Sequence, residues 1–283
     1  MRRLVALYRS PAFSPNQHRR NDRAILDAVV DHLSGGGWRV VRATEPEIVQ
    51  GRLPAGDLYL NMCQGPEASA LLQQQLPADA VCINPPEAVL SCHRHRLVSL
   101  LQGSSIPFPA TVVISTTGPE AAAPPVHLVT DNGYPVWLKR GDVHAQTAED
   151  VVAVRVPELR QALSRFAGRG ILRVALQAHV PGPVVKFYGV IGREFFHCYP
   201  AEAGDPPDTR CDEPLQELAE RAAQALGLAV YGGDAVLTAS GTPVLIDLND
   251  WPSFAPVRAS AAAAIARFAS RRALSNRYSC STP

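Results

Sequence analysis

Oxygen-bearing side chains follow a short apolar run near the C-terminal end of the chain. Residues 244–246 are apolar and predict a buried strand, and Asp247 and Asn249 come after them at a spacing of two. In an extended strand this spacing turns both side chains to one face. Mg²⁺ takes oxygen ligands, usually with only one or two carboxylates, alongside waters and substrate phosphates. The pair therefore indicates a Mg²⁺ site that works with a phosphate compound, with Mn²⁺ as an alternative ion, whereas an isolated Asp-x-Asn would indicate a turn.

A preceding strand brings a third oxygen ligand to this site. Residues 229–237 predict a strand, and a Ser-Gly-Thr-Pro turn at residues 240–243 joins it to the next strand, as in a β-hairpin. Asp234 lies on the first strand and can face Asp247 on the second. We therefore expect Asp234, Asp247 and Asn249 to converge on one metal ion.

Lysine is rare in this chain, and its two positions stand out. Of 27 lysine and arginine residues only Lys139 and Lys186 are lysines, and both fall at strand-like positions. Lysine is a compact point charge that commonly binds phosphate, whereas arginine presents a rigid planar fork. Two phosphate-binding lysines are the functional interpretation, and chance placement of a rare residue is the alternative.

The order of these features resembles the ATP-grasp superfamily. A hairpin with an aspartate on one strand and Asp-x-Asn on the next, followed by proline and a helix, looks like the metal-binding end of these enzymes. The resemblance implies that Asp234, Asp247 and Asn249 hold Mg²⁺ between the phosphates of ATP. It also implies four residues that contact ATP. They are the helix residue Arg96, the strand-end lysine Lys139, the hinge residue Gln177 and a second lysine, Lys186. Relatives usually carry lysine at the first of these positions, and Arg94 or His93 is an alternative there.

The same resemblance implies an α/β chain in three parts. Residues 1–92 would form an N-terminal open parallel-sheet domain, the pre-ATP-grasp domain, and residues 93–178 and 179–283 would form two α+β lobes that clasp ATP. The alternation of strands and helix near the N-terminus agrees with a parallel sheet, and its segments are residues 4–8, 22–33, 38–42 and 57–61. The helices expected farther along span residues 148–166, 213–226 and 259–268. Neither a G-x-G-x-x-G nor a P-loop sequence occurs, which disfavours other nucleotide-binding folds.

A histidine bears on the reaction class. His144 stands five residues after Lys139, in place of the glycine-rich loop of most ATP-grasp proteins. This resembles the ATP-grasp inositol phosphate kinases, in which a histidine at this offset faces the transferred phosphoryl group. The resemblance implies a kinase-like phosphotransferase with His144 and Lys186 as catalytic residues.

The alternative reaction is that of the wider RimK-like group, the ATP-dependent carboxylate–amine ligases, which act through an acyl phosphate. Aspartate rather than glutamate at position 247 favours the kinase, as does the absence of an arginine from the strand that ends near Tyr199. Most relatives use that arginine to stabilise the transferring phosphoryl group or the acyl phosphate. Arg193 or Arg210 could substitute for it from another direction.

The acceptor substrate is expected where the N-terminal strands end, because open α/β sheets bind ligands at the carboxyl ends of their strands. A loop rich in basic residues follows the first strand, and the residues that we assign to the acceptor site are Arg9, His18, Arg19, Arg20, Arg94 and Ser253. Their positive charge indicates a small anionic metabolite. A basic surface loop that touches no substrate is the alternative.

Length and composition restrict the class of protein. A chain of 283 residues that is 46% hydrophobic can bury a substantial core, and its formal charge of +1 gives no global reason to expect nucleic acid or an acidic membrane surface as a partner. No apolar run approaches the ~20 residues that span a bilayer. The six cysteines are scattered without metal-site spacing and no signal peptide precedes them, so we expect reduced thiols and a cytoplasmic protein. The sequence leaves the oligomeric state open.

Overall fold

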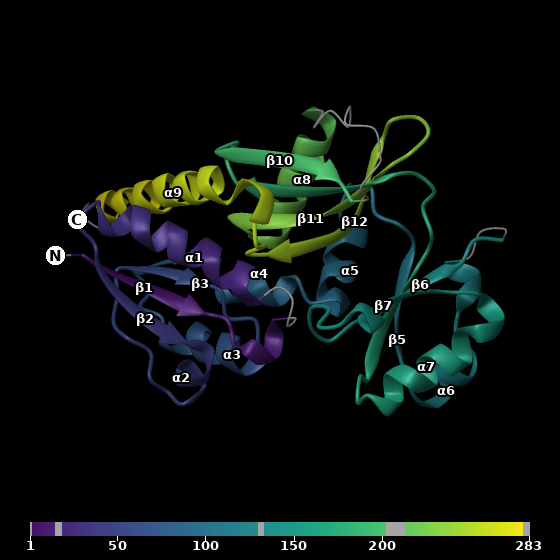
Figure 1. The fold of residues 1–283 in the computed structure, drawn as a ribbon. Helices are drawn as coiled ribbons and strands as arrows, with labels where there is room; N and C mark the ends of the chain where they lie inside the picture. The colour runs from purple at the N-terminus through teal and green to yellow at the C-terminus, as the bar shows by residue number, and fades with distance from the viewer. Residues whose placement is uncertain (1, 15–18, 130–132, 202–212, 280–283) are drawn as a thin grey trace.

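Three four-stranded sheets form the framework of the chain in the computed structural model, which describes residues 2–14, 19–129, 133–201 and 213–279 (Figure 1). The first sheet is parallel and the other two are antiparallel. Helices pack on the faces of all three sheets. The α/β class expected from the sequence is confirmed.

The N-terminal sheet is parallel, with strand order β2-β1-β3-β4. Its central strand buries every side chain from Leu4 to Leu7, because a parallel strand that is covered on both faces must be apolar on both. Helix α1, together with the last helix of the chain, covers one face, and α2 and α3 cover the other. The elements are β1 (Arg3–Tyr8), α1 (Arg19–Ser34), β2 (Arg39–Thr44), α2 (Glu45–Val49), β3 (Leu58–Asn61), α3 (Pro66–Gln75) and β4 (Val81–Ile83).

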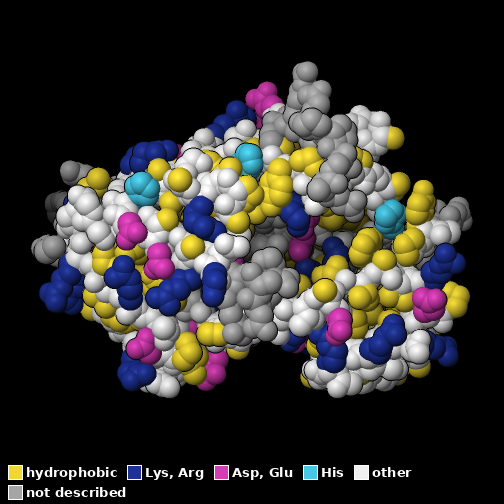
Figure 2. Space-filling model, viewed as in Figure 1, with side chains coloured by type: hydrophobic (Ala, Val, Ile, Leu, Met, Phe, Trp, Pro, Cys, Tyr) yellow, Lys and Arg dark blue, Asp and Glu magenta, His cyan; other side chains and the backbone are white. Residues whose placement is uncertain are grey.

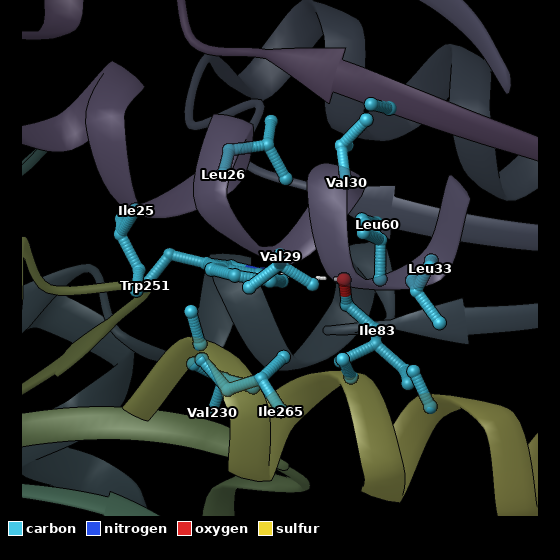
Figure 3. Packing of buried hydrophobic residues seen from close by; sticks show 14 of the residues in the cluster. Ile25, Leu26, Val29, Val30, Leu33, Leu60, Ile83, Val230, Trp251 and Ile265 are labelled. Carbon is cyan, nitrogen blue, oxygen red and sulfur yellow. Dashed lines mark hydrogen bonds between the residues drawn. The ribbon is translucent and has the colours of Figure 1, made fainter. Parts of the chain in front are cut away.

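One hydrophobic core joins the two ends of the chain. Helix α9 (Arg258–Ser279) lies along α1, so the C-terminal helix packs against the N-terminal domain (Figure 1). Figure 3 shows Trp251, from the segment that leads into α9, packed among Val29 of α1 and Ile265 of α9. Its indole Nε1 donates a hydrogen bond to the carbonyl oxygen of Ile83 at 3.2 Å. The end of the last strand is thereby fixed to the N-terminal sheet.

The central lobe is an antiparallel sheet with strand order β5-β8-β6-β7. Helix α7 packs against one face of this sheet through Leu163 and Phe166. The short helix α4 and the helix α5 lead from the N-terminal domain into the lobe. The elements are α4 (Pro86–Ser91), α5 (Arg94–Gln102), β5 (Thr111–Ser115), α6 (Gly118–Ala122), β6 (Val136–Arg140), β7 (Val151–Val154), α7 (Leu159–Gly168) and β8 (Arg173–Gln177).

The helix expected over residues 148–166 is wrong in its first half. Residues 151–154 form β7, which pairs with β6, and α7 begins only at Leu159. Three of the four residues of β7 are valines, whose branched side chains favour a strand. Pro157, which follows β7, has no backbone N–H to donate within a continuous helix. The expected helix therefore began too early, at residue 148, whereas the apolar periodicity belongs to α7 alone.

The C-terminal lobe is an antiparallel sheet with strand order β10-β9-β11-β12, and α8 packs against one of its faces. The predicted hairpin of β11 and β12 is confirmed, because Asp234 pairs with Asp247 across the two strands. A β-bulge follows this pair: Ala235 pairs with Leu245, so Ile246 has no partner in the ladder. The elements are β9 (Val184–Val190), β10 (Phe195–Pro200), α8 (Glu213–Leu226), β11 (Val230–Leu237) and β12 (Pro243–Asp250).

A glycine allows the two hairpin strands to approach each other beside the bulge. A Cβ atom built at Gly233 would lie 2.2 Å from the backbone carbonyl oxygen of Asp247. No side chain fits at that distance, so only glycine permits this register. The position of the Asp247 carboxylate therefore depends on Gly233.

A buried asparagine connects the N-terminal domain to the hairpin. The Asn84 side chain is fully buried, and its Oδ1 accepts hydrogen bonds from the backbone N–H groups of Ala229 and Val230 at 2.8 and 2.9 Å. Its Nδ2 donates to the carbonyl oxygen of Val230 at 2.7 Å. The backbone carbonyl of Asn84 accepts in turn from Asn61 at the end of β3. The start of β11 is therefore held against the carboxyl ends of the parallel strands.

The composition led us to expect reduced cysteines. Cys63, Cys82 and Cys92 carry free thiols. Cys198 is disulfide-bonded, so the expectation that every cysteine is reduced is wrong at this position. Among the helices of the described ranges, none combines the length and the apolar character needed to cross a bilayer.

The Asn84 contact predicts a large loss of stability on substitution. Asn84→Ala removes three hydrogen bonds and leaves two backbone N–H groups of the hairpin buried without partners. Each orphaned group costs ~1–3 kcal/mol, so we expect the free energy of unfolding to fall by about 3 kcal/mol or more. The measurement is urea denaturation of both proteins. Gln74→Ala, on the exposed surface of α3, is the matched control, and an equal effect of both substitutions would contradict the prediction.

Candidate functional site

Two adjoining cavities lie between the lobes. The lobe cavity, of about 370 Å³, is lined by β6, β8, β9 and the hairpin and includes Trp137, Lys139 and Gln177. The three-domain cavity, of about 340 Å³, is lined by Arg9, Asn249 and other residues from all three parts of the chain. The two share a wall formed by Arg94, Ala145, Lys186, Asp234 and Asp247. Figure 2 shows acidic and basic side chains side by side in the hollow between the two halves of the molecule.

The structure brings together the three residues expected to bind a metal. Asp234 and Asp247 face each other on the hairpin, and Asn249 lies two residues farther along β12. All three line the three-domain cavity. Two carboxylates and an amide oxygen form a donor set that suits Mg²⁺ when substrate phosphates and waters complete its octahedral shell. The residues present therefore fit Mg²⁺ bound together with a phosphate compound.

Lys139 is held in place by the bulge in β12. Its Nζ donates a hydrogen bond to the carbonyl oxygen of Ile246, the unpaired residue of the bulge, at 2.9 Å. The side chain is buried and lines the lobe cavity. Burial lowers the pKa of Lys139 to about 8, although the neighbouring Asp247 carboxylate acts in the opposite direction. Lys139 thus extends from the central lobe to the C-terminal sheet.

Lys186 lies at the junction of the two cavities. Its Nζ is 3.0 Å from Oδ1 of Asp234, and the side chain remains partly exposed. Burial opposes its charge, but the Asp234 carboxylate outweighs burial and raises the pKa of Lys186 above the ordinary value. The ammonium group is therefore charged beside the expected metal ligands.

Arg94, rather than Arg96, reaches the cavities. The Arg94 Nη2 donates to Oδ2 of Asp247 at 2.6 Å, and its Nη1 donates to the carbonyl oxygen of Arg140 at 3.1 Å. Arg96 points to the surface, where it forms an exposed ion pair with Glu87 at 3.3 Å. Residues two apart in a helix face in different directions, so only one of the two can enter the site.

The Asp247 carboxylate is ionised although it is buried. Burial alone would raise its pKa, but the charges of Arg94, Lys139 and His144 together hold the pKa below the ordinary value of aspartate. A buried carboxylate with this many cationic neighbours is stable as an anion. Asp247 therefore serves both as a counter-charge and as an expected metal ligand.

Aromatic and amide groups line the other end of the lobe cavity. The Gln177 side chain is buried, and its Nε2 donates to Oγ1 of Thr111 at 3.1 Å. The Trp137 ring stacks near His179, and its Nε1 donates to the His179 Nδ1 at 3.2 Å. These groups present flat faces and fixed polar atoms at a mostly apolar wall. A planar heterocycle would match such a wall.

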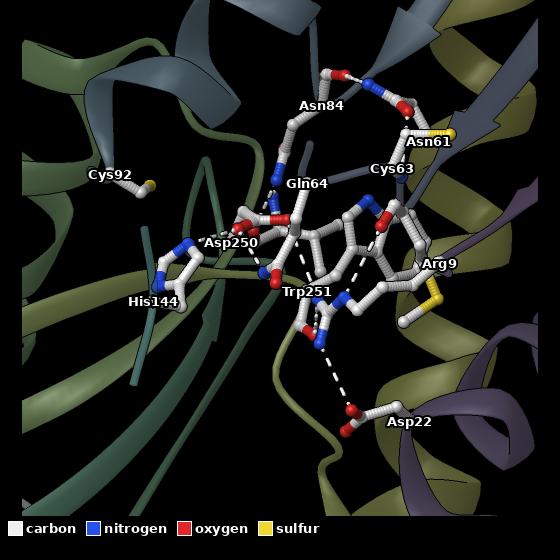
Figure 4. Close-up of polar contacts among 12 residues, drawn as sticks. Arg9, Asp22, Asn61, Cys63, Gln64, Asn84, Cys92, His144, Asp250 and Trp251 are labelled. Atoms are coloured by element: carbon white, nitrogen blue, oxygen red, sulfur yellow. Dashed lines mark hydrogen bonds and ion pairs between the residues drawn. The ribbon is translucent and has the colours of Figure 1, made fainter. Parts of the chain in front are cut away.

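The sequence reasoning missed Asp250, the last residue of β12. Its buried carboxylate accepts a hydrogen bond from Gln64 at 2.8 Å and lies 3.0 Å from the His144 Nε2 (Figure 4). Arg9 approaches the other carboxylate oxygen at 3.7 Å. Burial acts to raise the pKa of Asp250, but His144 and Arg9 outweigh it and lower the pKa. Strand alternation turns Asp250 away from the face of Asp247 and Asn249, and the sequence gives no sign of its distant partners.

His144 comes from the loop after β6 and lines the three-domain cavity, where its ring lies against Asp250. The loop is anchored at its other end by Asp150, which accepts from the backbone N–H of Gln146 at 2.7 Å and pairs with Arg169. Gln146 also donates to the carbonyl oxygen of Ala12 in the N-terminal domain. The loop therefore bridges the central lobe to the other two parts of the chain.

The structure describes only part of the basic cluster expected for the acceptor substrate. Arg9 lines the three-domain cavity, but its Nη1 donates to Asp22 at 3.1 Å and its Nη2 to the Trp251 carbonyl oxygen at 3.3 Å. Ser253 lines the same cavity. Arg19 begins α1, Arg20 is exposed, and His18 lies outside the described residues.

Of the two arginines considered as substitutes in phosphoryl stabilisation, the structure places only Arg193, and it lies outside the site. Arg193 is exposed and pairs with Glu213 and Glu217 on α8. Arg210 lies outside the described residues. The guanidinium that does reach the expected phosphate region is that of Arg94.

Comparison with protein families and with solved structures gives different results. No family model matches the sequence, and no curated protein matches it. Solved structures match over nearly the whole chain. A D-alanine–D-alanine ligase from Bacillus anthracis complexed with ATP superposes with a TM-score of 0.67 at 12% identity, covering 97% of this chain and 99% of the other.

Two further structures agree. A RimK domain ATP-grasp protein from Sphaerobacter thermophilus gives a TM-score of 0.63 at 21% identity, covering 94% of this chain and 99% of the other. The VanG D-Ala:D-Ser ligase from Enterococcus faecalis gives 0.65 at 14% identity, with 89% and 91% covered. Likeness at these identities establishes architecture rather than substrate. The chain therefore has the fold of the ATP-grasp superfamily.

Proposed function

We propose that the chain is a Mg-ATP-dependent carboxylate–amine ligase that acts through an acyl phosphate. One observation carries this proposal. Two lysines, an arginine and three oxygen ligands surround the junction of two cavities that share a wall. One cavity has the apolar walls that a nucleotide base needs, and the other offers space for a second molecule beside the phosphates.

The lysines and the arginine account for the binding of ATP phosphates. Lys186 and Arg94 lie on the wall that the two cavities share, and Lys139 lines the lobe cavity. Fixed cations at this point stabilise negative charge that develops on a transferring phosphoryl group, without reorganisation during the reaction. Mg²⁺ held by Asp234, Asp247 and Asn249 would add further neutralisation of the phosphates. Arg94 takes the part that the sequence assigned to Arg96, and it also supplies the missing guanidinium.

The pairing of charges favours the ligase over the kinase. Each lysine or arginine among the described residues of the three-domain cavity already has a carboxylate partner: Arg9 pairs with Asp22, Arg94 with Asp247, and Lys186 with Asp234. An acceptor bearing several phosphates would need spare cations. A small molecule with one carboxylate does not. The similar solved structures named above point the same way, because two are named as ligases and the third as a RimK domain protein.

The reaction that we propose has two steps. A substrate carboxylate oxygen attacks the γ-phosphorus, an oxygen–phosphorus bond forms, and the bond to the departing ADP breaks. An amine then attacks the acyl carbon, phosphate leaves, and the amine releases a proton. Lys186 and Arg94 neutralise charge on the phosphoryl group in the first step. His144 has no phosphoryl acceptor to orient in this scheme, so we do not assign it a catalytic role.

The first prediction concerns the lysines. Lys139→Ala and Lys186→Ala should each weaken ATP binding, because a charge-assisted bond contributes ~1.5–3 kcal/mol and its loss raises Kd by roughly tenfold or more. Since only the protonated amine binds phosphate and burial lowers the pKa of Lys139 to about 8, binding to the unmodified protein should weaken as the pH rises through that value. Lys139→Ala should remove this pH dependence. Calorimetry measures both effects, with the exposed Arg165→Ala as control, and wild-type affinity in either lysine variant would contradict the assignment.

The metal set gives a second prediction. Asp247→Asn keeps the shape of the side chain and its bond to Arg94 but removes a charged ligand. We expect the affinity for Mg-ATP to fall by about tenfold or more, while the affinity for ATP without Mg²⁺ changes little, because Mg²⁺ binds here only with nucleotide. The comparison is calorimetry with and without Mg²⁺. Asp31→Asn, on the exposed face of α1, should behave as wild type; an unchanged Mg-ATP affinity in Asp247→Asn would exclude this residue as a ligand.

The reaction class has its own test. The protein is incubated with Mg-ATP, a mixture of small carboxylic acids labelled with ¹⁸O in the carboxylate, and a mixture of amines. Transfer through an acyl phosphate places one carboxylate oxygen in the released phosphate, so mass spectrometry should detect labelled inorganic phosphate only when both mixtures are present. A Lys186→Ala variant measures the background. ADP formation with the phosphoryl group retained on an organic product would instead establish the kinase.

A further inference from the structure

A cysteine, a histidine and an aspartate meet beside the three-domain cavity. Cys92 ends α4 in the N-terminal part of the chain, His144 lies in the central-lobe loop, and Asp250 ends β12. One ligand atom from each of the three lies within 4.8 Å of the others. Figure 4 shows the Cys92 sulfur on the side that faces His144 and Asp250. None of the three belongs to the Mg-ATP set proposed above.

Two atoms of this cluster are buried and have no hydrogen-bond partner among the residues that the structure describes. The His144 Nε2 and the Asp250 Oδ2 are both in this state, and the Asp250 residue is only 1% exposed. The Oδ1 of Asp250 lies 3.0 Å from the His144 Nε2 and accepts a hydrogen bond from Gln64. Arg9 is 3.7 Å from Oδ2, which is too far for one. Unsatisfied buried polar atoms are rare and indicate a missing partner, often an ion.

We propose that Cys92, His144 and Asp250 bind one Zn²⁺ ion, separate from the Mg²⁺ of the nucleotide site. Thiolate sulfur, imidazole nitrogen and carboxylate oxygen are the ligands of zinc in proteins, and three protein ligands leave the fourth tetrahedral position open to water. A thiolate selects zinc over Mg²⁺, which takes oxygen ligands. On binding, the Cys92 thiol gives its proton to solvent, and the thiolate and the carboxylate balance the charge of the ion.

The observed separations are compatible with this coordination. Ligand atoms bound at ~2.0–2.3 Å to a tetrahedral zinc lie roughly 3.3–3.8 Å from one another. The His144 and Asp250 atoms are already 3.0 Å apart. The Cys92 Sγ now contacts the carbonyl oxygen of Ala88 at 3.5 Å, a weak interaction that a metal bond can replace. A rotation of the thiol and a small shift of the carboxylate complete the site.

Zinc at this position would tie the three parts of the chain together. Its ligands come from the end of α4, from the loop after β6 and from β12, which belong to three different parts of the chain. His144 lies on the wall of the three-domain cavity, which gives an ion a path from solvent. Bound zinc should therefore slow backbone hydrogen exchange in the loop at residues 141–147.

Cobalt spectroscopy of the unmodified protein tests the proposal directly. The metal-free chain is titrated with Co²⁺ alone, in the absence of nucleotide. We expect one equivalent to produce the intense visible bands of a tetrahedral ion and a sulfur-to-cobalt charge-transfer band, both of which one equivalent of Zn²⁺ abolishes. Binding at the Asp234, Asp247 and Asn249 set would give neither signal, because those ligands are all oxygen atoms. Absence of the charge-transfer band overturns the proposal without reliance on any variant.

Variants then identify the ligands. Cys92→Ser, His144→Gln and Asp250→Asn should each weaken Zn²⁺ binding by on the order of a hundredfold, measured with a competing chelator, because even loss of an outer partner costs 10–100-fold. Cys92→Ser should also remove the charge-transfer band. The matched controls are Cys63→Ser, a buried thiol in another core, and His95→Gln on α5. Circular dichroism verifies that each variant is folded. A charge-transfer band that survives in folded Cys92→Ser, or that disappears in Cys63→Ser, overturns the assignment.

Discussion

The structure depends on the neutralisation of two buried carboxylates on one strand. Asp247 and Asp250 lie on β12, and burial alone would favour their protonated forms. The pKa of each is instead lowered by side chains from other parts of the chain: Arg94 and Lys139 for one, and His144 and Arg9 for the other. Removing one partner from such a buried pair leaves an uncompensated charge, which is far more costly than the net gain of forming it. The three parts of the chain therefore have to meet around β12, and the two cavities form where they do.

This constraint also determines what the acceptor site can hold. A cation paired with a carboxylate that is not a metal ligand offers a substrate little net charge. Arg9 is an example, because its guanidinium donates hydrogen bonds to Asp22 and the Trp251 carbonyl and forms an ion pair with Asp250. The sequence shows a basic loop, and the fold converts part of it into a structural support. The count of basic residues near a site is thus a poor guide to the charge of its substrate.

Local features of the site could be predicted from the sequence, and distant ones could not. The hairpin, the alternation that aligns Asp247 with Asn249, and the two isolated lysines all depend on residues close in sequence or on unusual composition. Asp250 was missed because its partners Gln64 and Arg9 lie 186 and 241 positions away. The sequence pattern favours Arg96, whereas the structure turns Arg94 toward the hairpin, since the two residues are about half a helical turn apart. Similarly, the helix expected over residues 148–166 included a run of valines. In the structure these valines form a strand that pairs with the edge of the central sheet.

The contacts of the central lobe with β12 are also the contacts that pair its charges. Moving the central lobe away from β12 would separate Lys139 from the Ile246 carbonyl and His144 from Asp250, and it would remove two side chains that lower the pKa of Asp247 and Asp250. Water entering the opened cleft would solvate the carboxylates. Their lost partners would thus be replaced by hydration. The balance between the two states is then close, because desolvation offsets much of the Coulomb attraction in the closed state. A ligand that brings its own charges to the junction can shift such a balance, and its differential affinity for the closed state sets the limit of that shift.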